Sequence, residues 1–290
     1  MRIALATRSN LPSWEVDDKI LRAALVDRGI EVSEVPWDRP DVAWEDFDAC
    51  VIRTTWDYQE RRADFVGWAE RAAGVTRLFN PAPIVRWNTH KSYLRDLEAR
   101  GVPVVPTVWL QAGSRVDVAR LLEERGWRRG FLKPAVGAAA RATMRFDAAQ
   151  AGRAQRHLER LLECEDMMLQ PYLASVESEG EISAVFIDAE LTHAVRKIPV
   201  PGDYRVQDDF GARDEPRTLS PGELALARHA VQAAPGPVLY ARADFIRDDA
   251  GDLRVTELEL VEPSLFFRHG RHAAARLADA LIQRLRPAGG

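Results

Sequence analysis

Val255-Thr256-Glu257-Leu258-Glu259-Leu260-Val261-Glu262-Pro263-Ser264 has the alternation of a half-buried β-strand. Successive side chains of a strand point to opposite faces, so Glu257 and Glu259 share one face while the intervening leucines can enter a core. Asp244 ends another short apolar strand and can supply a third carboxylate. Carboxylates held together repel unless a cation compensates them, and oxygen ligands of this kind suit Mg²⁺ together with phosphate oxygens. The stretch therefore predicts a metal–nucleotide site formed by Asp244, Glu257 and Glu259.

Composition narrows the class of protein. The chain has 290 residues, 46% hydrophobic and 29% charged, which is typical of an ordinary globular protein of about two domains. A net charge of -4 gives no nucleic-acid footprint. No run approaches the roughly 18 apolar residues of a membrane helix. Cys50 and Cys164 lie far apart, which argues against a disulfide framework. We expect a cytoplasmic protein that binds neither nucleic acid nor membrane.

The pattern of strands and helices predicts three units. Strands separated by helices indicate a parallel α/β domain over residues 1–87. A smaller α+β unit follows over residues 88–172, with a helix expected over 89–100. A strand-rich unit over residues 173–290 begins with a hairpin at Asp188-Ala189-Glu190 and contains both carboxylate strands and a final helix over 271–284. The predicted fold class is thus mixed α/β and α+β.

Two lysines and a small-residue turn are candidates for binding phosphate. Lys91 lies at the start of the expected helix and Lys133 ends a strand, although for either lysine alone an exposed, solvated side chain is the better explanation. The turn at Gly137-Ala138-Ala139-Ala140 has small side chains that let backbone N–H groups approach a phosphate. Taken alone, the turn is better explained by packing under a helix.

Other polar residues are weaker candidates. Gln170 and Tyr172 follow an apolar strand where backbone groups could bind an adenine, although on their own they are better explained as the plain end of a core strand. Arg205 and Gln207 lie in a polar loop, where the arginine could hold a carboxylate or a phosphoryl group or simply be solvated. Lys197 fits either a site wall or an exposed strand face.

Substrate candidates come from the ends of strands. Arg53-Thr54-Thr55-Trp56-Asp57-Tyr58 follows the most apolar strand of the first unit, and open α/β sheets bind ligands at the carboxyl ends of their strands. Arg53 and Thr55 are therefore candidates, with packing of the two aromatic residues as an equal alternative. Ser264 follows the carboxylate strand and fits either a ligand contact or a turn.

Taken in order, these motifs resemble those of the ATP-grasp superfamily from about residue 86 to 268. The part from Gln170 to Ser264 looks most like the ATP-binding part of glutathione synthetases. The runs at 53–58, 86–91 and 257–264 resemble the subgroup containing the cyclo-ligase that closes O-ureido-D-serine to D-cycloserine. Two departures stand out: the loop at Gly137 is poor in glycine, and Glu259 takes the place of the superfamily's usual asparagine.

The resemblance implies an ATP-grasp fold, with nucleotide between a small lid unit and the strand-rich unit. It implies ATP and Mg²⁺ as cofactors and a carboxylate–amine ligase that forms an acyl phosphate on a small amino-acid-like substrate, with intramolecular ring closure as the finer expectation. Homodimerisation is left open. The alternatives are a ligase acting on a peptide or protein terminus and a non-catalytic nucleotide-binding module. By position, the resemblance implies the following roles: ATP contacts from Lys91, Lys133, Gly137, Gln170, Tyr172 and Gln207; catalysis by Arg205 and Lys197; metal binding by Asp244, Glu257 and Glu259.

Overall fold

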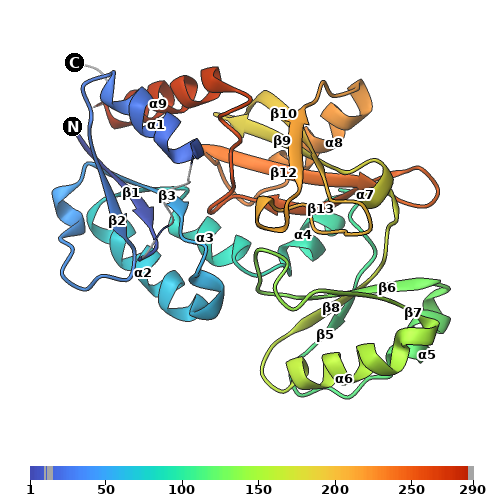
Figure 1. Cartoon of the computed structure of the whole chain (residues 1–290). Helices are drawn as coiled ribbons and strands as arrows, with labels where there is room; N and C mark the ends of the chain where they lie inside the picture. The colour runs from blue at the N-terminus through green and yellow to red at the C-terminus, as the bar shows by residue number, and fades with distance from the viewer. Residues whose placement is uncertain (10, 12–15, 287–290) are drawn as a thin grey trace.

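The computed structural model describes residues 1–9, 11 and 16–286. Its strands form three sheets, which Figure 1 shows as a blue unit, a green unit and a yellow-to-orange unit along the chain. The N-terminus and the last helix, Arg271–Leu285, both lie beside the first unit (Figure 1). No described helix is long and apolar enough to cross a membrane.

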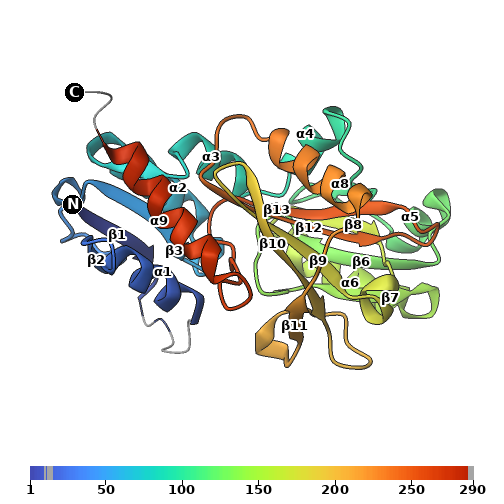
Figure 2. The same ribbon diagram turned by 90° about the horizontal axis from the view of Figure 1, so that it is seen from above.

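The first sheet is parallel, as predicted, with the order β2-β1-β3-β4. Its two faces follow the alternation of β1: Ile3 and Leu5 pack toward α1 and α9, while Ala4 and Ala6 pack toward α2 and α3. Helix α9 therefore packs on the first sheet, although it comes from the C-terminal part of the chain (Figure 2). The elements are β1 Arg2–Thr7, α1 Val16–Val26, β2 Glu31–Pro36, β3 Ala49–Thr54, α2 Arg62–Val75, β4 Arg77–Phe79, α3 Ala82–Asn88 and α9 Arg271–Leu285.

The small middle unit is an antiparallel sheet of order β5-β8-β6-β7. Leu132 of β6 packs into a core with α5 and α6. Alternation then turns its neighbour Lys133 to the uncovered face. The elements are α4 Tyr93–Ala99, β5 Val108–Leu110, α5 Val118–Arg125, β6 Arg129–Pro134, β7 Met144–Asp147, α6 Ala151–Leu162 and β8 Met167–Pro171.

The third sheet is antiparallel, with the order β11-β10-β9-β12-β13. The predicted hairpin joins β9 to β10 through Asp188 and Ala189, whose positive φ angles of 55° and 62° suit a two-residue turn. One face of the sheet packs on α8 and α4. The elements are α7 Ser175–Ser178, β9 Glu181–Ile187, β10 Glu190–Ile198, β11 Arg213–Pro216, α8 Pro221–Gln232, β12 Tyr240–Arg247 and β13 Leu253–Glu259, with short 3₁₀ turns at Trp44–Asp46, Tyr58–Glu60, Ala148–Gln150 and Asp208–Phe210.

The helix expected over residues 89–100 is shorter than predicted. It begins at Tyr93, and Lys91 lies in the turn that separates α3 from α4. The backbone N–H of Lys91 donates to the carbonyl of Ala135 at 2.7 Å, so this turn bonds to the segment after β6 instead of extending a helix. The division of the chain near residues 87 and 172 stays a prediction, since α9 packs in one core with strands of both the first and the third sheet.

Candidate active site

A cavity of about 560 Å³ opens where the second and third sheets face each other beside the ends of the first. Three of the chain's four lysines, Lys91, Lys133 and Lys197, line it. Thr55 is not among the lining residues: it is fully buried, and its hydroxyl has no hydrogen-bond partner within the described part of the chain. The other sequence-predicted residues that line the cavity are Arg53, Gly137, Gln170, Tyr172, Arg205, Gln207, Asp244, Glu257, Glu259 and Ser264.

The carboxylates meet through strand register. Asp244 of β12 lies directly opposite Glu257 of β13, and Arg242 lies opposite Glu259. Leu258, between the two glutamates, is fully buried in the core on the other face. Glu257 and Glu259 therefore share one face of β13, as the alternation predicted, and that face lines the cavity.

Two lysines converge on Glu257. The Nζ atom of Lys91 lies 2.9 Å from Glu257 Oε1, and that of Lys133 lies 3.4 Å from the same oxygen. Burial acts to raise the pKa of Glu257, but the two ammonium groups outweigh it and hold the pKa at about 2. Burial also lowers the pKa of Lys133, against the attraction of Glu257. The carboxylate is thus ionised at neutral pH and faces two cations that can move to phosphate oxygens.

Asp244 is surrounded by donors. Ser183 Oγ donates to its Oδ1 at 2.6 Å, Lys197 Nζ lies 3.1 Å from its Oδ2, and Arg242 forms a two-point contact with it. Although its burial opposes ionisation, Arg242 and Lys197 hold the pKa of Asp244 well below the usual range. Lys197 also reaches Glu181 at 2.5 Å.

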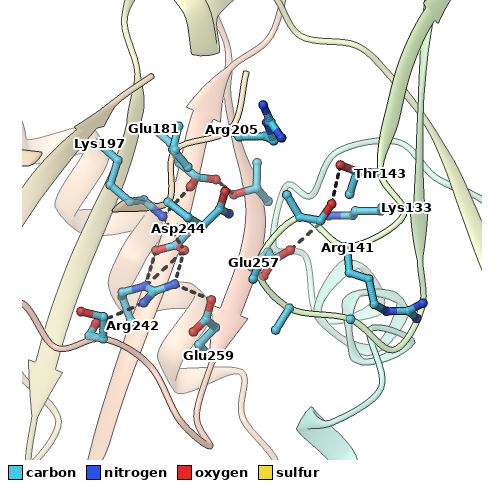
Figure 3. A pocket seen from close by; sticks show the side chains of 18 of the residues that line it. Lys133, Arg141, Thr143, Glu181, Lys197, Arg205, Arg242, Asp244, Glu257 and Glu259 are labelled. Carbon is cyan, nitrogen blue, oxygen red and sulfur yellow. Dashed lines mark hydrogen bonds and ion pairs between the residues drawn. The ribbon is translucent and has the colours of Figure 1, made fainter. Parts of the chain in front are cut away.

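The sequence analysis missed Arg242 and Glu181. The signal for Arg242 was its spacing of two residues from Asp244, which places both on one strand face. Its guanidinium also pairs with Glu259. Figure 3 shows it between Asp244 and Glu259, with Glu257 turned toward Lys133 across the cavity. Burial raises the pKa of Glu259 to about 6 even though Arg242 opposes that rise.

The donor set fits Mg²⁺ in chemistry. Mg²⁺ is held through one or two carboxylates together with phosphate oxygens and water, and the registered pair Asp244 and Glu257 supplies acceptor-only oxygens kept ionised by their neighbours. Within the described residues, no three His, Cys, Asp or Glu side chains gather closely enough to hold a metal by themselves. The side chains of Arg242, Lys197 and Lys91 instead form ion pairs with the carboxylate oxygens.

The nucleotide-binding candidates lie on the wall formed by the second sheet. Gln170 is buried and donates to Thr107 Oγ1 at 2.8 Å. The Tyr172 hydroxyl donates to Glu177 at 2.5 Å.

In the turn after β6, Ala139 and Ala140 have φ angles of 50° and 54°. Left-handed backbone costs an alanine roughly 1–2 kcal/mol, and such strain concentrates at functional sites. The turn thus adopts a glycine-like conformation although it is poor in glycine.

The loop carrying Arg205 and Gln207 lies against the same sheet. Arg205 pairs with Asp203 at 2.6 Å and stays apart from the carboxylate cluster in Figure 3. The carbonyl oxygen of the Gln207 side chain is buried without a hydrogen-bond partner among the described residues. The Tyr204 hydroxyl is 2.9 Å from that of Thr143, in the turn just before β7, which holds the loop across the cavity.

Arg53 supports the segment after β13. It is 2% exposed, donates through Nε to Asp18 at 2.9 Å, and donates through Nη2 to the carbonyl of Pro263 at 2.9 Å. Ser264 Oγ donates to Asp17 at 2.8 Å. The carboxyl end of β3 is therefore joined directly to the chain that follows the two glutamates.

Two side chains that the sequence analysis did not select hold the free edge of β13. Asn88 donates to the carbonyl of Leu258 at 2.8 Å and accepts from the N–H of Leu260 at 2.7 Å. The Tyr93 hydroxyl accepts from the N–H of Leu258 at 3.0 Å. Their only sequence signal is proximity to Lys91, since the strand that they support lies about 170 residues away.

Three sheets enclosing a cavity with paired carboxylates, facing lysines and a small-residue turn define an ATP-grasp ligase. The crystal structure of D-cycloserine synthetase DcsG superimposes with a TM-score of 0.89 at 33% identity, covering 99% of this chain and 100% of that one. Residues 3–80 match the family described as the N-terminal domain of D-cycloserine synthetase DcsG.

Two curated relatives are similar to this chain in sequence. The cycloserine biosynthesis protein DcsG of Streptomyces lavendulae is 37% identical over 273 residues, covering 89% of this chain and 90% of the relative. The glutathione synthetase of Prochlorococcus marinus (strain MIT 9313) is 31% identical over 225 residues, covering 75% of this chain and 66% of that protein. The chain belongs to the ATP-grasp superfamily, in the family of DcsG.

This membership confirms the predicted fold class and enzyme class. The protein is an ATP-dependent carboxylate–amine ligase, and ATP with Mg²⁺ are the cofactors of its class. It also sets aside the alternative of a non-catalytic nucleotide-binding module. The roles of individual residues and the identity of the substrate belong to the proposals below.

Proposed function

We propose that this protein activates the carboxylate of a small amino-acid-like substrate as an acyl phosphate and closes it on a nitrogen of the same molecule. The reaction that we assign is the conversion of O-ureido-D-serine to D-cycloserine. The observation that carries the proposal is the convergence of Lys91, Lys133 and the registered pair Asp244 and Glu257 on one cavity, in a chain similar over most of its length to a D-cycloserine synthetase.

The chemistry requires charge neutralisation. A carboxylate is a poor electrophile, so its oxygen attacks the γ-phosphorus of ATP, the bond to the β-phosphate oxygen breaks, and ADP leaves. Lys91 and Lys133 are placed to turn from Glu257 to the phosphates, while Asp244 and Glu257 would hold Mg²⁺. The bound cation supplies electrostatic stabilisation of the charge that spreads over the transferring phosphoryl group.

Ring closure then follows on the activated carboxylate. The nitrogen bonded to the side-chain oxygen attacks the carbonyl carbon, and the bond to phosphate breaks. Water then attacks the carbamoyl carbon, the bond from that carbon to the ring nitrogen breaks, and the nitrogen takes up a proton. The carbamoyl group leaves as carbamic acid, which breaks down to CO₂ and NH₃, so the conversion to D-cycloserine balances. Water competes with the nitrogen for the acyl phosphate. The loop carrying Arg205 and Gln207 serves as the cover, because Tyr204 joins it to Thr143 in the turn before β7.

The test is a reconstitution with purified protein, ATP, Mg²⁺ and O-ureido-D-serine, reading ADP formation and product mass. We expect ADP release that requires the substrate, together with the mass of the cyclic product. A parallel panel of amino acids and short peptides, each with a separate amine, tests ligation to a second molecule. Substrate-dependent ADP release that occurs only with that panel would replace the cyclisation with the peptide-directed alternative.

A further inference from the structure

Glu262 is an acid that the proposed chemistry does not use. It is 9% exposed and lines the cavity three residues beyond Glu259. Within the described part of the chain, no other residue donates a hydrogen bond to its side-chain carboxylate or forms an ion pair with it; its own backbone is the one donor beside it. The neighbouring acids differ, because Asp244, Glu257 and Glu259 each contact a lysine or an arginine.

An isolated buried carboxylate is costly, because ionisation in a poorly solvated place needs a compensating cation. The nearby cations Lys91 and Arg242 are engaged elsewhere, with Glu257 and with the pair Asp244 and Glu259. Burial raises the pKa of Glu262 to about 8, and the charge on Glu259 adds to that rise. The site therefore lacks the positive charge that would keep Glu262 ionised, and without it the carboxyl is largely protonated at neutral pH.

The backbone around Glu262 is held in place. Trp56 Nε1 donates to the Glu262 carbonyl at 3.0 Å, and Arg53 donates to the next carbonyl, that of Pro263, at 2.9 Å. Both donors come from the carboxyl end of β3. Glu262 thus lies on the side of the cavity next to the first sheet, whereas the nucleotide candidates Gln170, in β8, and Tyr172, just after it, lie beside the second sheet.

ATP is an anion and cannot supply the missing charge, but an amino acid substrate carries an ammonium group. We propose that Glu262 binds the protonated α-amino group of the substrate and so orients its carboxylate toward the transferring phosphate. This inference rests on the proposed function and adds a specificity-determining residue to it. A carboxylate–ammonium contact gives charge-assisted hydrogen bonds, which are stronger than neutral ones.

The experiment compares two compounds that both retain the reacting carboxylate and nitrogen: O-ureido-D-serine and 3-(ureidooxy)propanoic acid, which lacks the α-amino group. ADP release is measured for the wild type, Glu262→Gln and the control Glu98→Gln, an exposed glutamate outside the cavity. We expect the wild type and the control to prefer the amino compound by about tenfold to a hundredfold in kcat/KM. In Glu262→Gln the preference should fall below about threefold, with the KM for ATP unchanged.

Four results would overturn the inference, and they can be told apart. If Glu262→Gln keeps the wild-type preference, or loses the same factor on both compounds, Glu262 does not bind the ammonium group although the proposed function stands. Should wild type release no ADP with O-ureido-D-serine, the proposed function and this inference fall together. For a variant too slow to assay, the shift in Tm caused by each compound gives the same comparison, and equal loss of both shifts also overturns it.

Discussion

Asp244 and Glu257 lie directly opposite each other on β12 and β13, and the next pair on the same face is Arg242 with Glu259. Each acid of the first pair also contacts a cation that the fold brings from another segment: Lys197 for Asp244, and Lys91 with Lys133 for Glu257. The arrangement is a layer of alternating charges in which the cations are placed to exchange their carboxylate partners for phosphates.

Replacing Glu257 by glutamine should remove one metal ligand and leave Lys91 and Lys133 without their anion. We expect ATP turnover to fall by at least about a hundredfold, because electrostatic stabilisation of the transferring phosphoryl group carries the catalysis. ADP release at saturating substrate measures this, and Tm verifies that the fold is retained. Glu215→Gln is the matched control on β11 of the same sheet, outside the cavity. Near-normal turnover in Glu257→Gln would remove Glu257 from the metal site.

Replacing each of the three cavity lysines should affect either ATP affinity or kcat, depending on what the lysine binds. Lys133→Met and Lys91→Met each remove a charge that we assign to ATP phosphates, so the Kd for ATP should rise by about tenfold or more. Lys197→Met removes the partner of Asp244 and Glu181 and should reduce kcat more than ATP affinity. Equilibrium nucleotide binding and steady-state kinetics measure the two quantities. An unchanged Kd for ATP in both Lys133→Met and Lys91→Met would reject their assignment to the phosphates.

Arg53 should act on stability as well as on the substrate. Its replacement by methionine leaves Asp18 buried without its partner and frees the carbonyl of Pro263, which should lower the free energy of unfolding by about 3 kcal/mol. Arg28→Met breaks the more exposed pair with Asp279 and should cost less than about 1 kcal/mol. Urea unfolding of both variants measures the difference. In Arg53→Met the KM for the substrate should rise more than that for ATP. Equal unfolding costs in the two variants would contradict the supporting role of Arg53.

Stability should depend on pH through Glu262. Burial raises the pKa of its carboxyl to about 8 in the folded protein, above the ordinary value of 4.5. The folded state therefore binds this proton more tightly than the unfolded state, and the contribution is lost as pH rises through the folded pKa. Relative to Glu262→Gln, the wild type should lose about 3 kcal/mol of unfolding free energy between about pH 5 and pH 8, since one pKa unit is worth about 1.4 kcal/mol. Parallel pH profiles for the two proteins would show that Glu262 is not shielded from solvent.

Much of the site was predictable because its signals are local. The alternation in Glu257-Leu258-Glu259 gave the shared face, and strand ends identified Lys133 and Arg53 as candidates. Thr55 shows the limit: it stands in a loop that borders the cavity, yet its own side chain turns inward and is fully buried. Arg242 was missed because an arginine two residues from an aspartate on a strand is common. The local sequence does not show that Glu259 of the neighbouring strand lies opposite Arg242.

The sequence by itself determined the parallel first sheet, the hairpin at Asp188 and the acidic face of β13, because steric periodicity acts over a few residues and is written in neighbouring letters. Only the tertiary structure decided which cation meets which acid. Lys91 reaches Glu257 across 166 residues of chain, and Asn88 fixes the edge of the same strand from 170 residues away. Such contacts depend on how whole sheets pack, and the unpaired state of Glu262 becomes visible only when every neighbour has been placed.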